Sequence, residues 1–487
     1  MNLHSRIQNY IDGQHLDSLS GEFFDNIDPS TGKSYSTIPN SDAKDVELAY
    51  QAAKKAFPVW SRMEEKERAA WMIRLATAIE KNLESFAKAE SVDNGKPISL
   101  ARQMDIPRSV ANLKFFASAI LHWNSEAHIT DHQALNYTLR KPIGVVGCIS
   151  PWNLPLYLFT WKIAPAMATG NCVVAKPSEI TPMTAYLLTK TCEEIGFPAG
   201  VLNVVHGTGS LAGSALVEHP GIKAISFTGG TATGAHIARV AAPMFKKLSL
   251  ELGGKNPNII FADADLEKAL KTTLRSSFAN QGQICLCGSR ILIHSSIYEE
   301  FKRQLVEKTQ SMSVGDPLSE ETKTGAVVSE AHMKKVLAYI ELAQEEGGVV
   351  LCGGDRVKLE GRCADGYFIA PTIIEGLGPH CRTNQEEIFG PVVTLQSFES
   401  DEEAIELANA TPYGLAASIW TKDLNRAHQL SSRMDSGIVW VNTWLMRDLR
   451  TPFGGVKNSG VGREGGWDAL RFFTEAQNVC IAFDDMR

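Results

Sequence analysis

Two short segments carry residue types that together suit covalent chemistry on a carbonyl group. Residues 278–285 form a polar, glycine-containing stretch that ends at Cys285. Residues 248–255 place Glu251 ahead of two glycines. A thiolate can add to a carbonyl carbon, and a carboxylate can take a proton from the water that later hydrolyses the adduct. The two segments therefore indicate a nucleophile and a general base.

Each of these residues also has an ordinary structural explanation. A lone cysteine is more often a small buried hydrophobe, but the polar approach to Cys285 favours a turn in which backbone dipoles raise the thiolate fraction. Glu251 could cap a helix or form an ion pair, whereas an apolar cleft would raise its pKa and make it a base near neutral pH. Cys287 could pack in the core or pair with Cys285 on oxidation. No His or Cys partners stand at ligand spacing, so we predict no metal site.

Strand and helix patterns alternate along the chain, and this alternation predicts parallel sheets. Strand–helix–strand units form sheets that helices cover on both faces. A chain of 487 residues also exceeds the size of a single core. We therefore predict two α/β domains with the chemistry in the cleft between them. The predicted strands are residues 143–149, 171–175, 201–205, 222–227, 257–261, 290–294 and 437–441, and the predicted crossover helices are residues 154–168, 182–195 and 211–218.

Five motifs resemble those of the NAD(P)-dependent aldehyde dehydrogenases, in the family's order and at similar spacings. They are Pro151-Trp152-Asn153, Lys176-Pro177-Ser178-Glu179, residues 248–255, residues 278–285, and Glu387-Ile388-Phe389-Gly390-Pro391. The resemblance covers essentially the whole chain. It implies the α/β aldehyde dehydrogenase fold, with two Rossmann-like parallel-sheet domains and a small β oligomerisation element. The implied division is 1–120 and 141–252 for the NAD-binding domain, 253–455 for the catalytic domain, and 121–140 with 456–487 for the oligomerisation and C-terminal element.

The resemblance also implies roles for the catalytic residues. Cys285 is the nucleophile, and Glu251 activates the water. Relatives that pass the acyl group to coenzyme A usually lack this glutamate, so its presence implies release of a free acid. Asn153 follows a predicted strand, where ligand-contacting loops lie, and could donate to the oxyanion, unless it only braces the loop. Lys162 stands where the family often places a lysine linked to proton transfer, although a surface lysine with a buried stem is the alternative.

The cofactor site is less clearly marked, because no Gly-x-Gly-x-x-Gly motif follows a strand. Residues 227–234 follow a strand and open a helix whose amides could meet a pyrophosphate, although glycines at strand ends are usually only turns. Many relatives have serine where Gly230 stands. By resemblance, Lys176 and Glu179 face the adenosine ribose, where a carboxylate repels a 2′-phosphate, and this predicts NAD over NADP. The predicted cofactor residues are Ile149, Ser150, Trp152, Lys176, Ser178, Glu179, Gly209, Phe227, Thr228, Gly229, Gly230, Leu252, Gly253, Glu387 and Phe389.

Two arginines outside the common motifs bear on the substrate. Arg108 and Arg447 lie in segments that resemble the branch of the family that oxidises 2-aminomuconate and 2-hydroxymuconate 6-semialdehydes. In that branch the matching arginines are associated with the substrate carboxylate, which a guanidinium can hold by two parallel hydrogen bonds. Most arginines are surface or ion-pair residues, so each could instead be structural. The alternatives are a broad-specificity enzyme for retinal, betaine aldehyde or aliphatic aldehydes, and a structural relative without turnover.

Composition excludes several other classes of function. The net charge of −7 is modest and no basic run stands out, so we expect neither nucleic-acid binding nor a polybasic membrane anchor. Prolines and polar residues interrupt the most apolar region, residues 143–167, which we interpret as buried core and not as a membrane span. The nine cysteines have no framework spacing, and residues 1–8 lack an apolar signal, so we expect a cytoplasmic protein. The resemblance implies a homodimer or homotetramer.

Overall fold

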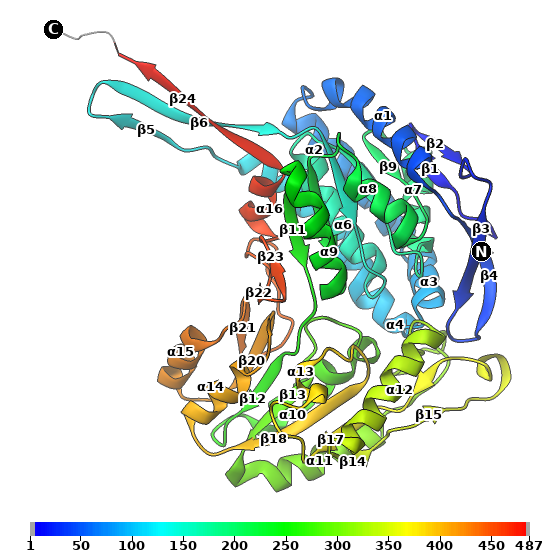
Figure 1. The fold of residues 1–487 in the computed structure, drawn as a ribbon, viewed down its shortest axis with the longest axis vertical. Coiled ribbons are helices and arrows are strands. Elements are labelled where there is room, and N and C mark those ends of the chain that lie inside the picture. Colours follow the sequence, from blue (N-terminus) through cyan, green and yellow to red (C-terminus); the bar gives the residue numbers. More distant parts are fainter. Residues whose placement is uncertain (1–4, 484–487) are drawn as a thin grey trace.

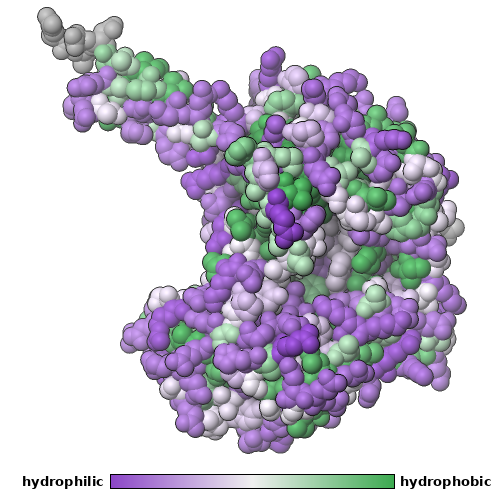
Figure 2. Space-filling view, viewed as in Figure 1, coloured by the Kyte–Doolittle hydropathy of each residue, from purple (hydrophilic) through white to green (hydrophobic). Residues whose placement is uncertain are grey.

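The computed structural model describes residues 5–483, which contain two large sheets, one small three-stranded sheet and three two-stranded sheets (Figure 1). Residues 1–4 and 484–487, which belong to the first and last predicted domain ranges, lie outside the described part. The first large sheet occupies the upper body in Figure 1 and the second occupies the lower body. Figure 2 shows that this face of the molecule is hollowed between the two bodies.

The first sheet has eight strands in the order β2-β1-β9-β8-β7-β10-β11-β23. Its five central strands run parallel, and the three short outer strands pair antiparallel. Chain order runs outward from β7 in one direction and from β10 in the other, so the strand order reverses between them. A crevice opens at the carboxyl ends of the strands at such a point. The strands are β1 Asn9–Ile11, β2 Gln14–Leu16, β7 Val145–Ile149, β8 Cys172–Lys176, β9 Leu202–Val204, β10 Ala224–Thr228, β11 Lys247–Glu251 and β23 Gly460–Val461.

Helices cover this sheet in two groups. Helix α6 packs with α5 and α7, whereas α8 packs with α1 and α9. All fourteen residues of α6 are buried, which explains why residues 143–167 form the most apolar region of the chain. The predicted interpretation of that region as core is therefore confirmed. The helices are α1 Ala43–Trp60, α2 Glu65–Lys81, α3 Leu83–Asn94, α5 Ile106–Ala119, α6 Pro155–Ala168, α7 Met183–Glu194, α8 Ser214–Glu218 and α9 Thr231–Ala241.

The second sheet has seven strands in the order β14-β17-β18-β13-β12-β20-β21. All its pairs are parallel except the edge pair of β14 and β17. The strands are β12 Pro257–Ile260, β13 Arg290–His294, β14 Val349–Cys352, β17 Thr372–Glu375, β18 Val392–Phe398, β20 Ala416–Trp420 and β21 Ile438–Val441, and the main helices are α10 Leu266–Phe278, α11 Tyr298–Gln310, α12 Glu330–Glu345, α14 Asp401–Asn409 and α15 Leu424–Arg433. All seven predicted strands and all three predicted helices are present, with ends shifted by a few residues. The predicted α/β fold class is confirmed.

The small sheet projects from the upper body in Figure 1. It consists of β5 Ala127–Thr130, β6 Ala134–Pro142 and β24 Thr474–Ala482, all paired antiparallel. One part of the implied C-terminal element lies elsewhere, because β23 pairs with β11 at the edge of the first sheet. A two-residue strand between glycines has no periodic pattern, so the sequence could not indicate this pairing. In residues 5–483 no helix is long and apolar enough to cross a membrane.

Candidate active site

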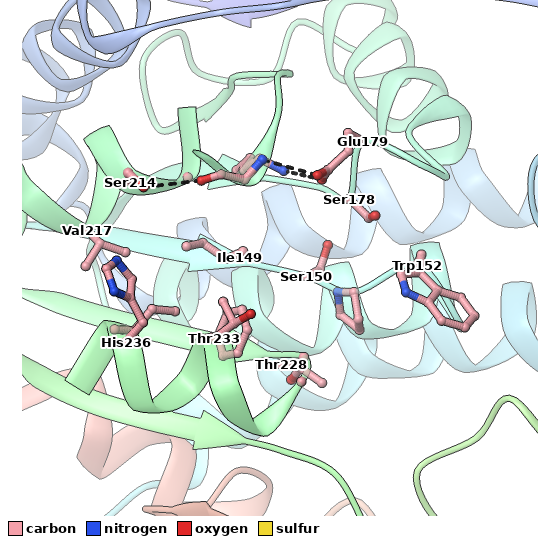
Figure 3. Close-up of a pocket in the computed structure, with 18 of the residues that line it drawn as sticks. Ile149, Ser150, Trp152, Ser178, Glu179, Ser214, Val217, Thr228, Thr233 and His236 are labelled. Carbon is pink, nitrogen blue, oxygen red and sulfur yellow. Dashed lines mark hydrogen bonds and ion pairs between the residues drawn. The ribbon is translucent and has the colours of Figure 1, made fainter. Parts of the chain in front are cut away.

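A cavity of about 340 Å³ opens where the strand order of the first sheet reverses. Figure 3 shows Ser178 and Glu179 on one side of it, Ile149 and Ser150 along β7, and Thr228 and Thr233 on the opposite side. Eleven of the predicted cofactor residues line this cavity: Ile149, Ser150, Trp152, Lys176, Ser178, Glu179, Gly209, Phe227, Thr228, Gly229 and Gly230. Residues from four separate strand ends therefore meet in one place.

Glu179 is held as a charged group at one side of this cavity. Its Oε2 accepts a hydrogen bond from Lys176 Nζ at 2.8 Å, and its Oε1 accepts one from the Gly209 backbone N–H at 3.2 Å. Burial acts to raise the pKa of Glu179, but the Lys176 ammonium and the two hydrogen bonds outweigh it and lower the pKa. A permanently ionised carboxylate can accept hydrogen bonds from ribose hydroxyls.

The opposite side of the cavity is the N-terminus of α9. Gly230 is the N-cap residue, and no side chain caps the helix. The first-turn N–H groups and the helix dipole therefore remain available to a phosphate anion. A Cβ added at Gly230 would meet nothing within 4 Å, whereas one at Gly229 would lie 2.4 Å from the Phe227 ring. The arrangement fits a dinucleotide.

A second cavity of about 240 Å³ links the cofactor residues to the thiol. Its lining includes Asn153, Cys285 and the remaining predicted cofactor residues Leu252, Gly253, Glu387 and Phe389. Glu387 Oε1 accepts a hydrogen bond from the Gly254 N–H at 2.9 Å. A Cβ at Gly253 would lie 2.5 Å from Glu387 Oε2, so only glycine allows this approach.

Two residues of this second cavity carried no signal in the sequence. His332 and Lys335 stand in the first turns of α12, far along the chain from every motif. The His332 ring lies 5.1 Å from the Trp152 ring, and its Nε2 bonds the Phe389 carbonyl at 2.7 Å. Burial lowers the pKa of His332 to about 4, so the ring is neutral at neutral pH.

The segment before Cys285 forms the predicted turn. Asn280 and Gln281 both adopt left-handed backbone angles, with φ of 51° and 57°. Cys285 is half-buried, and within residues 5–483 its backbone N–H has no hydrogen-bond partner. Burial raises the pKa of the thiol, with Glu387 and Glu251 adding to the effect and Arg447 opposing it, so the resting sulfur is protonated.

Asn153 stands beside this turn with its side chain fixed. Its Nδ2 donates to the Gln283 carbonyl at 3.0 Å, which leaves its second N–H available. The backbone carbonyl of Asn153 accepts hydrogen bonds from Asn280 Nδ2 at 2.9 Å and from Lys96 Nζ at 3.1 Å. Lys96 is itself fully buried against Glu90 and Asp105. The amide therefore has a rigid support and a free donor near Cys285.

Glu251 ends β11, with only 3% of its surface exposed and neither carboxylate oxygen hydrogen-bonded to a described residue. Burial raises its pKa well above the usual range, and Glu464 adds to this, while Lys162, Arg463 and Arg447 oppose it. A Cβ at Gly454 would lie 2.7 Å from Glu251 Oε1, so the 442–455 loop approaches the carboxylate closely. A carboxyl group whose pKa is raised is a stronger base than an ordinary glutamate when it is ionised, so it can take a proton from water.

Lys162 is buried and is not a surface lysine, being only 1% exposed. Its ammonium donates to Glu464 Oε1 at 2.6 Å and to Ser226 Oγ at 3.2 Å. Glu464 was not identifiable from the sequence, because it lies about 300 residues from Lys162, beyond any local pattern. Within this cluster, Glu464 raises the pKa of Glu251 and Lys162 lowers it.

Cys287 is a buried packing residue. It is 6% exposed, its carbonyl accepts from Asn256 Nδ2 at 2.8 Å, and burial raises the pKa of its thiol to about 12. The same Asn256 amide also donates to the Cys285 carbonyl at 2.7 Å. Asn256 thus holds the backbone on both sides of Leu286.

The two arginines come together although they lie on distant segments. Arg108 stands in the first turn of α5, directly after a π-helical turn at Ala101–Asp105. Its Nη2 lies 3.5 Å from the Leu445 carbonyl, and Leu445 is strained, with φ of 59°. Arg447 follows two residues later. Strained backbone persists where the surrounding structure enforces it, often at ligand sites.

Arg447 is packed among aromatic rings and retains an unused donor. Its Cζ lies 4.1 Å from the Trp161 ring centroid and 4.2 Å from that of Phe453. Its Nη1 donates to the Tyr157 hydroxyl, but its Nη2 is buried without a partner among the described residues. A buried donor without an acceptor is costly unless a ligand supplies one.

Comparisons with known proteins agree with this geometry. Residues 15–479 match the profile of the aldehyde dehydrogenase family. A 2-aminomuconic semialdehyde dehydrogenase of Danio rerio is 51% identical over 478 residues, which cover 98% of each chain. A 2-hydroxymuconic semialdehyde dehydrogenase of Pseudomonas sp. (strain CF600) is 45% identical, covering 98% of this chain and 99% of that protein. An NAD+ complex of an aldehyde dehydrogenase from Bacillus cereus superposes with a TM-score of 0.96 at 39% identity, covering 99% and 98% of the two chains.

Proposed function

Since the chain belongs to the aldehyde dehydrogenase family, we propose that it oxidises a carboxylated semialdehyde of the 2-aminomuconic or 2-hydroxymuconic type to the dicarboxylate. The cofactor is NAD, which a solved relative of the same fold binds. When bound, NAD accepts the hydride from the adduct. The ionised Glu179 and the N-terminus of α9 would hold its ribose and pyrophosphate.

In the proposed mechanism, the Cys285 thiol loses its proton to ionised Glu251, which passes it on to solvent, and the resulting thiolate attacks the aldehyde carbon. The free N–H of Asn153 and the unpaired backbone N–H of Cys285 donate to the resulting oxyanion. Loss of hydride leaves a thioester on Cys285. Glu251 then takes a proton from water, and the hydroxide releases the acid. The unpaired carboxylate of Glu251 and its raised pKa support this role.

One observation carries the substrate class: the buried, unpartnered Nη2 of Arg447, beside a second guanidinium at Arg108. Arg447 is also close enough to Cys285 and Glu251 to influence the pKa of both. A carboxylate on the substrate would supply the missing acceptor and balance the charge. An aliphatic aldehyde, retinal or a cationic aldehyde would leave the guanidinium unpaired, which disfavours the broad-specificity alternative.

The test is NAD reduction with 2-hydroxymuconic semialdehyde and with hexanal, an uncharged aldehyde of similar length, in wild type and Arg447→Ala. Losing a charged hydrogen bond should lower kcat/KM for the semialdehyde about ten- to a hundredfold and leave that for hexanal nearly unchanged. Arg450→Ala is the matched control, because Arg450 is exposed and, among the described residues, its side chain pairs only with Asp448.

Two outcomes would contradict the proposal. Equal losses on both substrates would make Arg447 structural, and a wild-type preference for hexanal would favour the broad-specificity alternative. NAD binding without thiol-dependent oxidation of either aldehyde would instead indicate a structural protein without turnover.

We further propose a cytoplasmic homo-oligomer, either a dimer or a tetramer. The projecting small sheet supports the assembly, since Ile129 and Ile481 are 61% and 50% exposed on it. Exposed apolar groups on an extended sheet are typical of a surface that a second copy covers. Nine free cysteines in the described residues support a reducing compartment. We also propose the division into NAD-binding, catalytic and oligomerisation parts, because the eight-stranded, seven-stranded and three-stranded sheets are separate from one another.

A further inference from the structure

The ring of Tyr157 lies close to both arginines, although no sequence motif indicated this residue. It is on α6 and is 2% exposed. The Cζ atoms of Arg108 and Arg447 lie 5.5 Å and 5.6 Å from its ring centroid. Asn112, on the same helix as Arg108, donates to the Tyr157 carbonyl at 3.0 Å and so fixes α5 against α6. The phenol therefore has a fixed position close to two cations.

The hydrogen bond between Arg447 and Tyr157 leaves the phenol hydrogen without an acceptor. A guanidinium has donors and no acceptor, so in the bond between Arg447 Nη1 and Tyr157 Oη the phenol oxygen accepts. The phenol hydrogen must then point to another acceptor, and the hydrogen bonds among residues 5–483 provide none for it. Arg447 Nη2 is also buried without a hydrogen-bond acceptor among the described residues. Two buried donors on adjacent side chains thus lack an acceptor, which is costly in an unliganded site.

We propose that Tyr157 is a third carboxylate-binding residue, whose O–H donates to the substrate carboxylate next to Arg447. A carboxylate has two oxygens with four acceptor positions, so it can accept from the phenol and from Nη2 at once. The O–H···O⁻ bond is charge-assisted, and two flanking cations attract the same anion. This inference rests on the proposed function, because it requires a substrate that carries a carboxylate.

Tyr157→Phe is the direct test, because it removes the hydroxyl and retains the ring that both arginines contact. We expect kcat/KM for 2-hydroxymuconic semialdehyde to fall about tenfold or more, and kcat/KM for hexanal to change less than about threefold. The inhibition constant of adipate, a six-carbon dicarboxylate, measured against hexanal should rise by a similar factor. Tyr298→Phe is the matched control, because the Tyr298 hydroxyl bonds Glu375 at 3.2 Å on the second sheet.

A double variant separates direct binding from support of Arg447. If the phenol only positions Arg447, then adding Tyr157→Phe to Arg447→Ala should cost nothing more. If the phenol reaches the carboxylate, the double variant should lose at least about a further threefold on the semialdehyde. Thermal unfolding of each variant shows whether it folds, and a destabilised Tyr157→Phe would be replaced by Tyr157→Met for the same measurements.

The outcomes distinguish this inference from the proposed function. Wild-type preference for the semialdehyde, with a selective loss in Arg447→Ala but an unchanged Tyr157→Phe, overturns only the role of Tyr157. Equal losses on hexanal and the semialdehyde in Tyr157→Phe also overturn it, because they indicate a packing role. Wild-type preference for hexanal overturns both proposals.

Discussion

Glu179 and Glu251 lie in the same body of the protein, yet their surroundings drive their pKa values in opposite directions. Glu179 follows β8 in the cofactor cavity, where Lys176 and the Gly209 N–H bond its two oxygens and lower its pKa. Glu251 ends β11 in the catalytic cleft, where neither oxygen has a described partner and burial raises its pKa. The two carboxyl groups share a chemistry but not an environment.

The difference indicates how the two regions work. A carboxylate that is paired keeps its charge at every physiological pH and can serve only in binding. A buried carboxyl group whose oxygens have no hydrogen-bond partner has a raised pKa, so its ionised form is a stronger base and can take a proton from water. Changes in the cleft should therefore abolish turnover, whereas changes in the cofactor cavity should mainly alter affinity.

The largest effect is expected at the nucleophile. Cys285→Ser replaces a thiol with a hydroxyl, which ionises far less readily, so turnover should fall at least about a thousandfold. The binding of NAD, measured by calorimetry, should stay within about threefold because the cofactor cavity is untouched. Cys287→Ser is the matched control, since Cys287 packs in the core. A Cys285→Ser enzyme with substantial turnover would contradict the assignment.

The next effect is expected at the base. Glu251→Gln should slow steady-state turnover about a hundred- to ten-thousandfold, because the thioester forms but no carboxylate activates water. Rapid mixing should show a burst of NADH equal to the number of active sites, followed by a slow phase. The same change at exposed Glu406 on α14 should do nothing.

The pH dependence of Glu251 gives a second measure of the same residue. Because its pKa is raised, the group remains protonated at pH values where an ordinary glutamate is ionised. Only the ionised form is a base, so the wild-type rate of thioester hydrolysis should rise as the pH increases through this raised pKa. Glu251→Gln should lose that rise. A wild-type hydrolysis rate that falls with increasing pH would argue against Glu251.

The smallest effect is expected in the cofactor cavity. Glu179→Gln removes the fixed charge while keeping the shape, so the KM for NAD should rise about tenfold and kcat should change less than about twofold. Discrimination against NADP should weaken, since the negative charge that repels a 2′-phosphate is gone. A fall in kcat with an unchanged KM would show that the two regions are not separate in function.

Local sequence patterns predicted most of the fold and part of the candidate site. The central strands are buried on both faces, and a strand of this kind is a continuous apolar run, as in Val145–Ile149 and Cys172–Lys176. Loops at the carboxyl ends of such strands meet at one edge, so the place of Asn153 after a strand predicted that it lies at a ligand site, whereas the role of Lys176 was implied only by the resemblance to the family. Short strands between glycines, such as Gly460–Val461, have no such pattern and could not be predicted.

Other contacts depend on segments that meet only after folding. Lys162 and Glu464 form a buried ion pair across about 300 residues, and no local feature of either indicates the other. His332 and Lys335 line the second cavity from α12, and the sequence of this helix contains none of the motifs identified above. Whether such side chains contact one another depends on how two distant segments pack together.

Residue types and local spacing predicted a thiol on a glycine-bent turn, a carboxyl group beside two glycines and an amide after a strand, and the resemblance to the family added two arginines. These features are present in the chain before it folds. The environment of each group, in contrast, depends on the tertiary structure. It gave Glu179 an ammonium partner, left Glu251 buried near Glu464 with no described hydrogen-bond partner, and brought Arg108 and Arg447 to the ring of Tyr157. The physical reason is that a pKa and an unpaired donor are properties of the surroundings, and here the surroundings are assembled from residues hundreds of positions apart.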